Sequence, residues 1–147
     1  MRLKSSLVAT AAALATIITP LIASPAAAAG QITEERVYNN AYYGQMTIGW
    51  KINPYRLDPI AITAEDHVTD GYVIGIRLVT SGEAGTKVWK MRTVPTGQTH
   101  AEWSTYLEAG WVDWAYFQVC KIRASNGVIA SCEDSRVMGN PFDDSSV

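Results

Sequence analysis

Residues 111–135 read WVDWAYFQVCKIRASNGVIASCEDS and contain both cysteines of the chain. The first part, residues 111–124, is rich in aromatic and β-branched side chains, which favours a long strand. Residues 128–135 follow after the short segment Ser125-Asn126-Gly127. A three-residue loop that ends in glycine is typical of a type I turn closed by a G1 bulge. The sequence therefore predicts an antiparallel hairpin here, with Gly127 in the left-handed conformation.

The same hairpin predicts a disulfide bond. An even number of cysteines in an exported chain favours a disulfide bond. Here the turn itself brings the two sulfur atoms opposite each other. A small register shift at a bulge would relieve the cysteines if they occupy a tight hydrogen-bonded pair. With the loop centred on Asn126, the predicted pairs are Ala124 with Val128, Ile122 with Ala130, and Cys120 with Cys132.

The first 29 residues have the three parts of a secretory signal. Arg2 and Lys4 are followed by an apolar run over residues 7–18, and Ala27-x-Ala29 stands before Gly30. A positive start, an apolar run of this length and small residues at the exit are typical of a cleaved signal peptide. A membrane anchor is the alternative, but it needs about 20 strongly apolar residues. We therefore expect general secretory export, cleavage near Ala29, and a secreted extracellular product without a membrane anchor.

The remaining residues 30–147 have the length of a single domain. Of the 12 basic and 14 acidic residues of the chain, the signal removes two bases and no acids, which leaves a balance of about −4. This mild acidity argues against nucleic acid or an anionic membrane surface as a partner. Within the domain, we expect residues 30–44 to be loosely ordered in part and residues 140–147 to form a flexible tail.

Three further segments alternate between apolar and polar residues, which is typical of half-buried strands. They are residues 45–52, 72–79 and 87–94. The side chains expected to point inward are Met46, Ile48, Trp50, Ile52, Tyr72, Ile74, Ile76, Leu78, Trp89 and Met91.

The segments between these strands contain strong turn signals. Asn53-Pro54 and Asp58-Pro59 indicate a loop, because a residue before proline is pushed out of the helical region. Residues 60–64 follow as a short strand, and residues 81–85 form a flexible hairpin loop. Residues 99–110 fit either a helix or a strand, and their aromatic content favours the strand. Six to eight short strands predict an all-β domain, either an antiparallel sandwich or a small barrel.

Tryptophan and tyrosine are the unusual part of the composition, with five and seven residues respectively. Their flat apolar faces and polar tips suit stacking on sugar rings or anchoring a protein partner. Some of them belong to the predicted core, as the inward phase of Trp50, Tyr72 and Trp89 indicates. The candidate binding residues are Tyr42, Tyr43, Trp103, Trp111, Trp114 and the acid Asp113, with Tyr38 as a further exposed aromatic.

Other chemistry-bearing residues give weak signals. His67 lies among acids, and His100 lies near Glu102, but neither belongs to a nucleophile or metal motif. The acids around His67 lack the spacing that gathers oxygens on Ca²⁺. We therefore expect no catalytic residues, metal or other cofactor.

These observations leave three functional hypotheses. The first is a non-enzymatic extracellular binding module for glycan or cell-envelope material. The second is a secreted inhibitor or protein-interaction domain that presents residues 81–86 or 125–127, since a rigid loop loses less entropy on docking. The third is a small hydrolase that uses Asp113 or His67.

Two stretches carry a resemblance to a known group. Residues 66–78 have the pattern Asp-x-x-x-Asp-Gly-Tyr followed by an alternating run, and Phe117-Gln118-Val119-Cys120 is followed later by Ser131-Cys132. In these features the chain resembles small secreted β-rich proteins of filamentous actinobacteria, a group without an assigned activity. The resemblance implies a β-sandwich with a disulfide and no catalytic residues.

Overall fold

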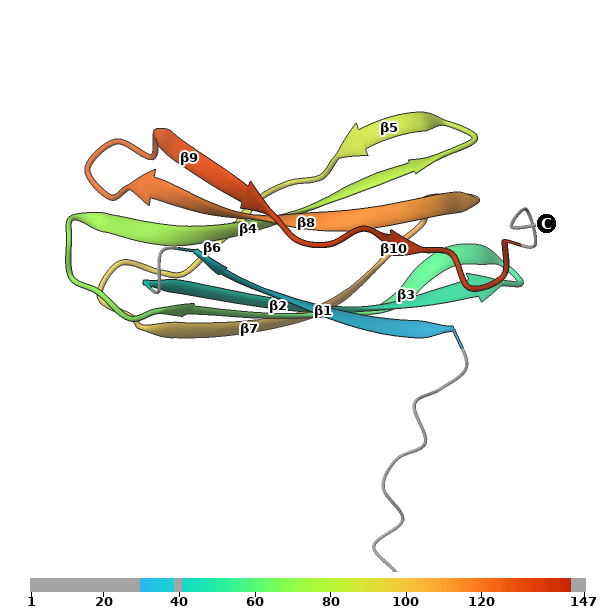
Figure 1. Cartoon of the computed structure of the whole chain (residues 1–147), viewed down its shortest axis with the longest axis horizontal. Coiled ribbons are helices and arrows are strands. Elements are labelled where there is room, and N and C mark those ends of the chain that lie inside the picture. The colour runs from blue at the N-terminus through green and yellow to red at the C-terminus, as the bar shows by residue number, and fades with distance from the viewer. Residues whose placement is uncertain (1–29, 39–40, 144–147) are drawn as a thin grey trace, which may run out of the picture.

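The computed structural model describes residues 30–38 and 41–143. Within these ranges the chain forms ten strands and no helix, which confirms the all-β prediction. The strands form two antiparallel sheets stacked face to face, so the molecule is a sandwich (Figure 1). The predicted signal peptide, residues 1–29, and the last four residues of the predicted tail lie outside the described residues.

Sheet A has the strand order β1-β2-β3-β7. Its strands are β1 (Gln31–Tyr38), β2 (Tyr42–Ile52), β3 (Tyr55–Asp66) and β7 (His100–Leu107). The prediction that residues 30–44 are loosely ordered in part is wrong for residues 31–38, because β1 pairs with β2 along its full length, from Gln31 opposite Gly49 to Tyr38 opposite Tyr42. Residues 39 and 40 lie outside the described residues. β7 occupies the ambiguous segment 99–110 and confirms the strand alternative.

Sheet B is built around two long strands, β4 (Tyr72–Gly82) and β8 (Val112–Arg123), which pair along almost their whole length. The short strands β5 (Gly85–Val88) and β6 (Arg92–Thr93) lie along the outer edge of β4. Along the outer edge of β8 lie β9 (Ile129–Asp134) and β10 (Met138–Gly139).

The single strand predicted over residues 87–94 is therefore two short strands with a break between them. The side chains of Trp89 and Met91 also go to different places. Trp89 packs against the core between the sheets, as predicted, whereas Met91 packs against a small cluster on the outer face of sheet B. The inward prediction for Met91 was wrong because the break in pairing ends the simple alternation.

The core between the sheets consists of the inward side chains of the long strands. Met46 and Ile48 from sheet A meet Ile76 and Phe117 from sheet B, and all four are fully buried. The predicted alternation of residues 45–52 holds except at Ile52, which is 53 % exposed. It is exposed because β2 ends there in the turn at Asn53-Pro54, beyond the edge of the core.

The loop predicted at Asp58-Pro59 is also absent, because β3 continues through it. The ladder between β2 and β3 shifts its register between Ile48 and Trp50, opposite this dipeptide. Gly49 lies at the shift, where a Cβ atom would come within 2.5 Å of the Asp58 carbonyl oxygen. The bulge accommodates the proline in the strand, and only glycine fits the close approach.

The β8–β9 hairpin confirms the predicted disulfide. Cys120 lies opposite Cys132, with an S–S distance of 2.03 Å and Cα atoms 4.0 Å apart. Past the cysteines the register shifts, so that Ile122 pairs with Ile129 and not, as predicted, with Ala130.

The turn of this hairpin explains the shift. The Arg123 carbonyl accepts the Gly127 N–H at 2.9 Å, and the Arg123 N–H donates to Val128 at 2.9 Å, which makes the connection wider than three residues. Gly127 has a φ of +70°, as predicted. The predicted pair of Ala124 with Val128 is absent, and both residues are exposed in the connection.

Residues 140–143, the described part of the expected tail, are more firmly held than predicted. Asn140, the first residue of the expected flexible tail, is buried, and both its backbone and its side chain bond to the start of β8. Its N–H donates to the Asp113 carbonyl, and its Nδ2 donates to the Val112 carbonyl, both at 2.7 Å. This anchoring fixes the run that leads from β10 across the edge of the sandwich (Figure 1).

Candidate functional site

The candidate aromatic residues do not form one surface. Tyr42 is 1 % exposed and lies between the sheets, so its predicted role as an exposed binding residue was wrong. Its Oη donates to both carboxylate oxygens of Asp70, at 3.0 and 2.9 Å. Burial and the Asp70 carboxylate raise the pKa of Tyr42 well above its usual range. Tyr38, the further candidate, is also buried, and its ring centroid lies 5.9 Å from that of Tyr42.

Asp70 gathers several donors in this corner of the sandwich. Besides Tyr42 it accepts the Lys121 ammonium at 2.8 Å and the Tyr72 N–H at 3.1 Å. The Lys121 hydrogen bond holds the pKa of Asp70 below its usual range. Lys121 also lies 4.1 Å from the centre of the Tyr72 ring. We call Tyr42, Asp70, Tyr72 and Lys121 the Asp70 cluster. It links β2, β4 and β8, and its polar groups bond to one another.

Trp103 lies on the inward phase of β7, is half-buried, and packs in part against the core. It also borders a surface hollow formed with Ala61 and Thr63 of β3. Tyr43 is half-buried on β2, where the register places it beside Glu65.

Trp111 and Asp113 lie together at the start of β8. The Trp111 Nε1 donates to Asp113 Oδ1 at 2.7 Å, and the Trp111 ring meets the Tyr55 ring edge-on at 5.3 Å. The carboxylate thus orients the indole of Trp111. Both residues are half-buried at one end of the sandwich, away from the corner that contains Tyr42.

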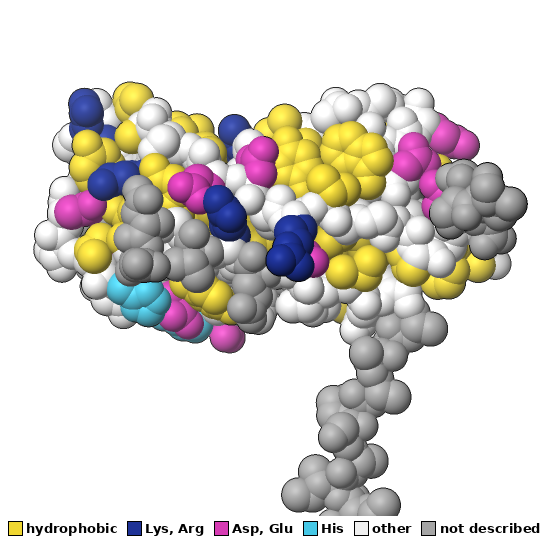
Figure 2. Space-filling view, in the orientation of Figure 1, with side chains coloured by type: hydrophobic (Ala, Val, Ile, Leu, Met, Phe, Trp, Pro, Cys, Tyr) yellow, Lys and Arg dark blue, Asp and Glu magenta, His cyan; other side chains and the backbone are white. Residues whose placement is uncertain are grey.

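Trp114 lies on the outer face of sheet B and has a neighbour that the sequence analysis missed. Tyr116 is two residues further along β8, on the same face, and the two rings stack with centroids 5.9 Å apart and planes 21° apart. The signal for this pair was present, since residues i and i+2 of a strand share a face. Hydrophobic side chains gather over this part of sheet B, above β10 (Figure 2).

Two polar rows border the stacked rings. On one side, Ser81 lies opposite Trp114 and shares a hydrogen bond of 3.2 Å with Thr86 of β5. Beyond Tyr116 on the same face of β8, Gln118 accepts the Arg77 Nε at 2.7 Å and donates to Asp134 at 2.7 Å. We call Trp114, Tyr116 and these two rows the aromatic face.

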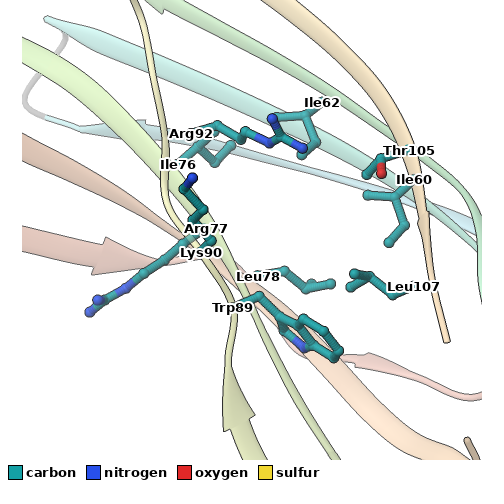
Figure 3. Close-up of a pocket in the computed structure, with 10 residues that line it drawn as sticks. All are labelled: Ile60, Ile62, Ile76, Arg77, Leu78, Trp89, Lys90, Arg92, Thr105 and Leu107. Carbon is teal, nitrogen blue, oxygen red and sulfur yellow. The ribbon is translucent and has the colours of Figure 1, made fainter. Parts of the chain in front are cut away.

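A separate cavity of about 100 Å³ opens between the sheets, along the side where β7 faces the break between β5 and β6. Its walls are aliphatic side chains of both sheets, with Trp89 at one end and Arg92 and Thr105 at the other (Figure 3). We call this cavity the slot. The aliphatic residues that line it are Ile60, Ile62, Ile76, Leu78 and Leu107.

Trp89 separates the slot from a second cavity of about 160 Å³. The indole Nε1 donates to Thr80 at 2.9 Å, and the Lys87 ammonium lies 4.0 Å from the ring centre. Lys90 and Arg92 are exposed at the mouth of the slot. Arg77 also borders it but points away, toward Gln118 on the outer face (Figure 3).

The two histidines come together on sheet A, which the sequence did not reveal. His67 Nε2 lies 3.1 Å from one oxygen of Glu65, and His100 Nδ1 lies 3.7 Å from the other. His100 Nε2 also lies 3.4 Å from Glu102. Figure 2 shows histidine beside acidic side chains at the lower left of the molecule. Among the described residues, no group of three or more His, Cys, Asp or Glu side chains is arranged to hold a metal ion.

Comparison with protein-family models, with curated proteins and with solved structures gives no match in any of the three. In residues 30–38 and 41–143, no helix is long and apolar enough to cross a membrane.

Proposed function

We propose that the chain is a non-enzymatic extracellular binding module that holds a polysaccharide on the aromatic face. The observation that carries the proposal is the stacked pair Trp114 and Tyr116, which lies on the outside of a sheet. Both side chains are half-buried, as expected for rings that lie against a sheet and leave one face open to a ligand.

The chemistry of the surrounding residues supports a sugar as ligand. A pyranose ring has C–H groups that pack against an aromatic face and hydroxyl groups around its edge. The hydroxyls lose water on binding and need partners, because an unpaired polar group costs about 1–3 kcal/mol. The hydroxyls of Ser81 and Thr86 beside Trp114, and the amide of Gln118 with the carboxylate of Asp134 beyond Tyr116, supply such partners at the border of the rings.

The dimensions of the strand support a chain of sugars over a single one. Alternate residues on a strand are about 6.8 Å apart, so the run from Trp114 through Tyr116 to Gln118 extends over two such intervals. The aromatic face also contains both a basic residue, Arg77, and an acidic one, Asp134. We therefore propose a neutral polysaccharide as the ligand, and not a strongly charged one.

The test is retention of the purified protein on a panel of insoluble polysaccharides, followed by calorimetry with soluble fragments of those that retain it. Trp114→Ala and Tyr116→Ala should each weaken binding by at least tenfold. Tyr106→Ala is the matched control, since Tyr106 is 57 % exposed but lies on sheet A. The proposal fails when no polysaccharide retains the protein, or when Tyr106→Ala weakens binding as much as Trp114→Ala.

A further inference from the structure

β7 is an edge strand whose outer side has no partner among the described residues. Its inner side pairs with β3, and the Asp66 N–H donates to the Thr99 carbonyl at 2.8 Å just before β7 begins. Hydrogen-bonded pairs alternate along an antiparallel ladder, so this bond fixes the phase. The pair of Ile62 with Trp103 is then hydrogen-bonded, and the N–H and C=O groups of Ser104 point to the open side.

An open strand edge is a template for another strand, and most proteins protect it with proline, charge or a covering segment. β7 contains no proline and no lysine, and its one acid, Glu102, is exposed on the outer face of sheet A, away from the slot. The backbone groups of Glu102 and Ser104 are therefore available to pair with an extended peptide, which is a common way to recognise one.

The slot lies beside this edge, because Thr105 and Leu107 of β7 form part of its wall. Side chains that lie opposite each other in paired strands point to the same face. A residue added opposite Thr105 would thus point inward, toward the slot. A cavity of about 150 Å³ holds a benzene molecule, so the slot, at about 100 Å³, suits a smaller aliphatic side chain.

The charge at the mouth of the slot selects the rest of the peptide. Lys90 and Arg92 are exposed there, and neither forms an ion pair with an acid among the described residues. The sequence from residue 84 to residue 101 contains no acid at all. This mouth is therefore a basic region on a chain that is acidic as a whole.

From these observations we propose that the β7 edge and the slot bind an extended segment of a partner protein by strand addition. The segment carries an aliphatic side chain for the slot and an acidic side chain, two residues away on the same face, for Lys90 and Arg92. This site is independent of the aromatic face, which lies on the opposite sheet.

The test is selection of a randomised octapeptide library, displayed on phage, against the intact protein. Selected peptides should carry an aliphatic and an acidic residue at positions two apart, and should shift the backbone amide resonances of Glu102 and Ser104 in NMR spectra. Ser104→Pro should weaken these peptides by at least tenfold, because it removes an N–H on the open side and leaves the pairing with β3 in place. Ser104→Ala, which keeps the N–H, should have no effect.

Lys90→Glu combined with Arg92→Glu should change the preference from acidic to basic peptides. Trp114→Ala should leave peptide binding unchanged, so failure here and failure of polysaccharide binding are separate results. The proposal is overturned when the library yields no binder, or when binders are insensitive to Ser104→Pro. It is equally overturned when Ser104→Pro dissolves a dimer of the protein, since a second copy would then be the occupant.

Discussion

The two long sides of the sandwich differ in how the gap between the sheets is covered. On one side, β1 of sheet A meets β9 of sheet B, and side chains cross between them. Arg36 pairs with Glu133, and Tyr38 Oη shares a hydrogen bond of 2.5 Å with Ser131. On the other side, β7 faces the break between β5 and β6, and the slot remains open.

This difference indicates where the fold can bind a ligand without losing stability. The closed side uses its polar groups on itself, and the Asp70 cluster lies in the same corner. The open side has an aliphatic wall, exposed cations and an unpaired strand edge. Ligand capacity between the sheets is therefore expected on the open side, and stability is expected to depend on the closed side.

Loss of the disulfide should have the largest effect, because the bridge holds the strand that closes the sandwich. Cys120 and Cys132 are 12 residues apart, and closing a loop of that size contributes about 3 kcal/mol on the chain-entropy model. Cys120→Ala with Cys132→Ala should lower the free energy of unfolding by about that amount, measured in urea. This is a large share of the roughly 5–15 kcal/mol typical of a domain.

Hydrogen exchange tests whether loss of the disulfide destabilises only the closed side. In the reduced protein, amides of β9 should exchange much faster while those of β7 change little. Reductant should have no effect on the double variant, which serves as the control. Equal acceleration in both strands would contradict the idea that the bridge serves the closed side.

Tyr42→Phe should have the next largest effect. It removes the hydrogen bonds to the Asp70 carboxylate, and such bonds to charged groups contribute about 1.5–3 kcal/mol. We expect a loss near the lower end, since Asp70 is about one third exposed. Urea unfolding of the variant at neutral pH measures it, with Tyr106→Phe, whose side chain is 57 % exposed on sheet A, as the matched control.

The pH dependence provides a second measure of the same cluster. The pKa of Tyr42 is raised in the folded state, so its contribution is complete below the unfolded value of about 10 and is lost as pH rises above it. The pKa of Asp70 is lowered, so its contribution is present above about 3.9 and is lost as pH falls. The difference in stability between wild type and Tyr42→Phe should therefore narrow at both extremes; a difference that is constant with pH would contradict this assignment.

Local patterns predicted the parts of the fold in which pairing and alternation agree. The hairpin from residue 111 onward, its disulfide and the inward residues of β2 and β4 follow from turn chemistry and a period of two. The bulge at Gly49 could not be predicted, because it depends on how Asp58-Pro59 fits into a ladder formed with another strand. β1 was missed because an edge strand with a polar sequence resembles a loop.

The candidate sites were harder to predict, because the exposure of an aromatic side chain depends on which face of its sheet it lies on and not on its residue type. Tyr42 and Trp103 are aromatic like Trp114, but they lie on inward phases of their strands. The slot depends on the break after β5, which leaves Lys90 at the mouth beside the inward side chain of Trp89. The break lies within a stretch whose alternation suggested a continuous strand, so no local signal revealed the opening.

Filling the slot should have a smaller and opposite effect. Thr105→Ile replaces the side-chain hydroxyl by an ethyl group beside the aliphatic wall, and cavity filling commonly adds about 0.5–2 kcal/mol. We expect a gain at the low end, because the slot is open to solvent on one side. Thermal unfolding measures the gain, and the same variant should lose the proposed peptide binding. A destabilised variant would show that the slot has no room for an added side chain.

The smallest effect on stability should come from the charged residues on the two sides. A charge on the closed side should contribute to stability, and a charge on the open side should not. Arg36→Gln removes the ion pair with Glu133, whose side chains are 41 % and 32 % exposed. Partly exposed pairs of this type contribute up to about 1 kcal/mol and are weakened by salt. Arg92→Gln removes a cation without an acidic partner in the described structure, so the free energy of unfolding should change by no more than about 0.5 kcal/mol.

A double-mutant cycle of Arg36→Gln with Glu133→Gln, in low and high salt, separates the energy of the ion pair from the effect of net charge. A coupling energy that falls in high salt would show that the ion pair stabilises the closed side. Coupling near zero, or a larger loss from Arg92→Gln than from Arg36→Gln, would mean that the two sides do not differ in electrostatic stabilisation, and their contrast would then lie in packing alone.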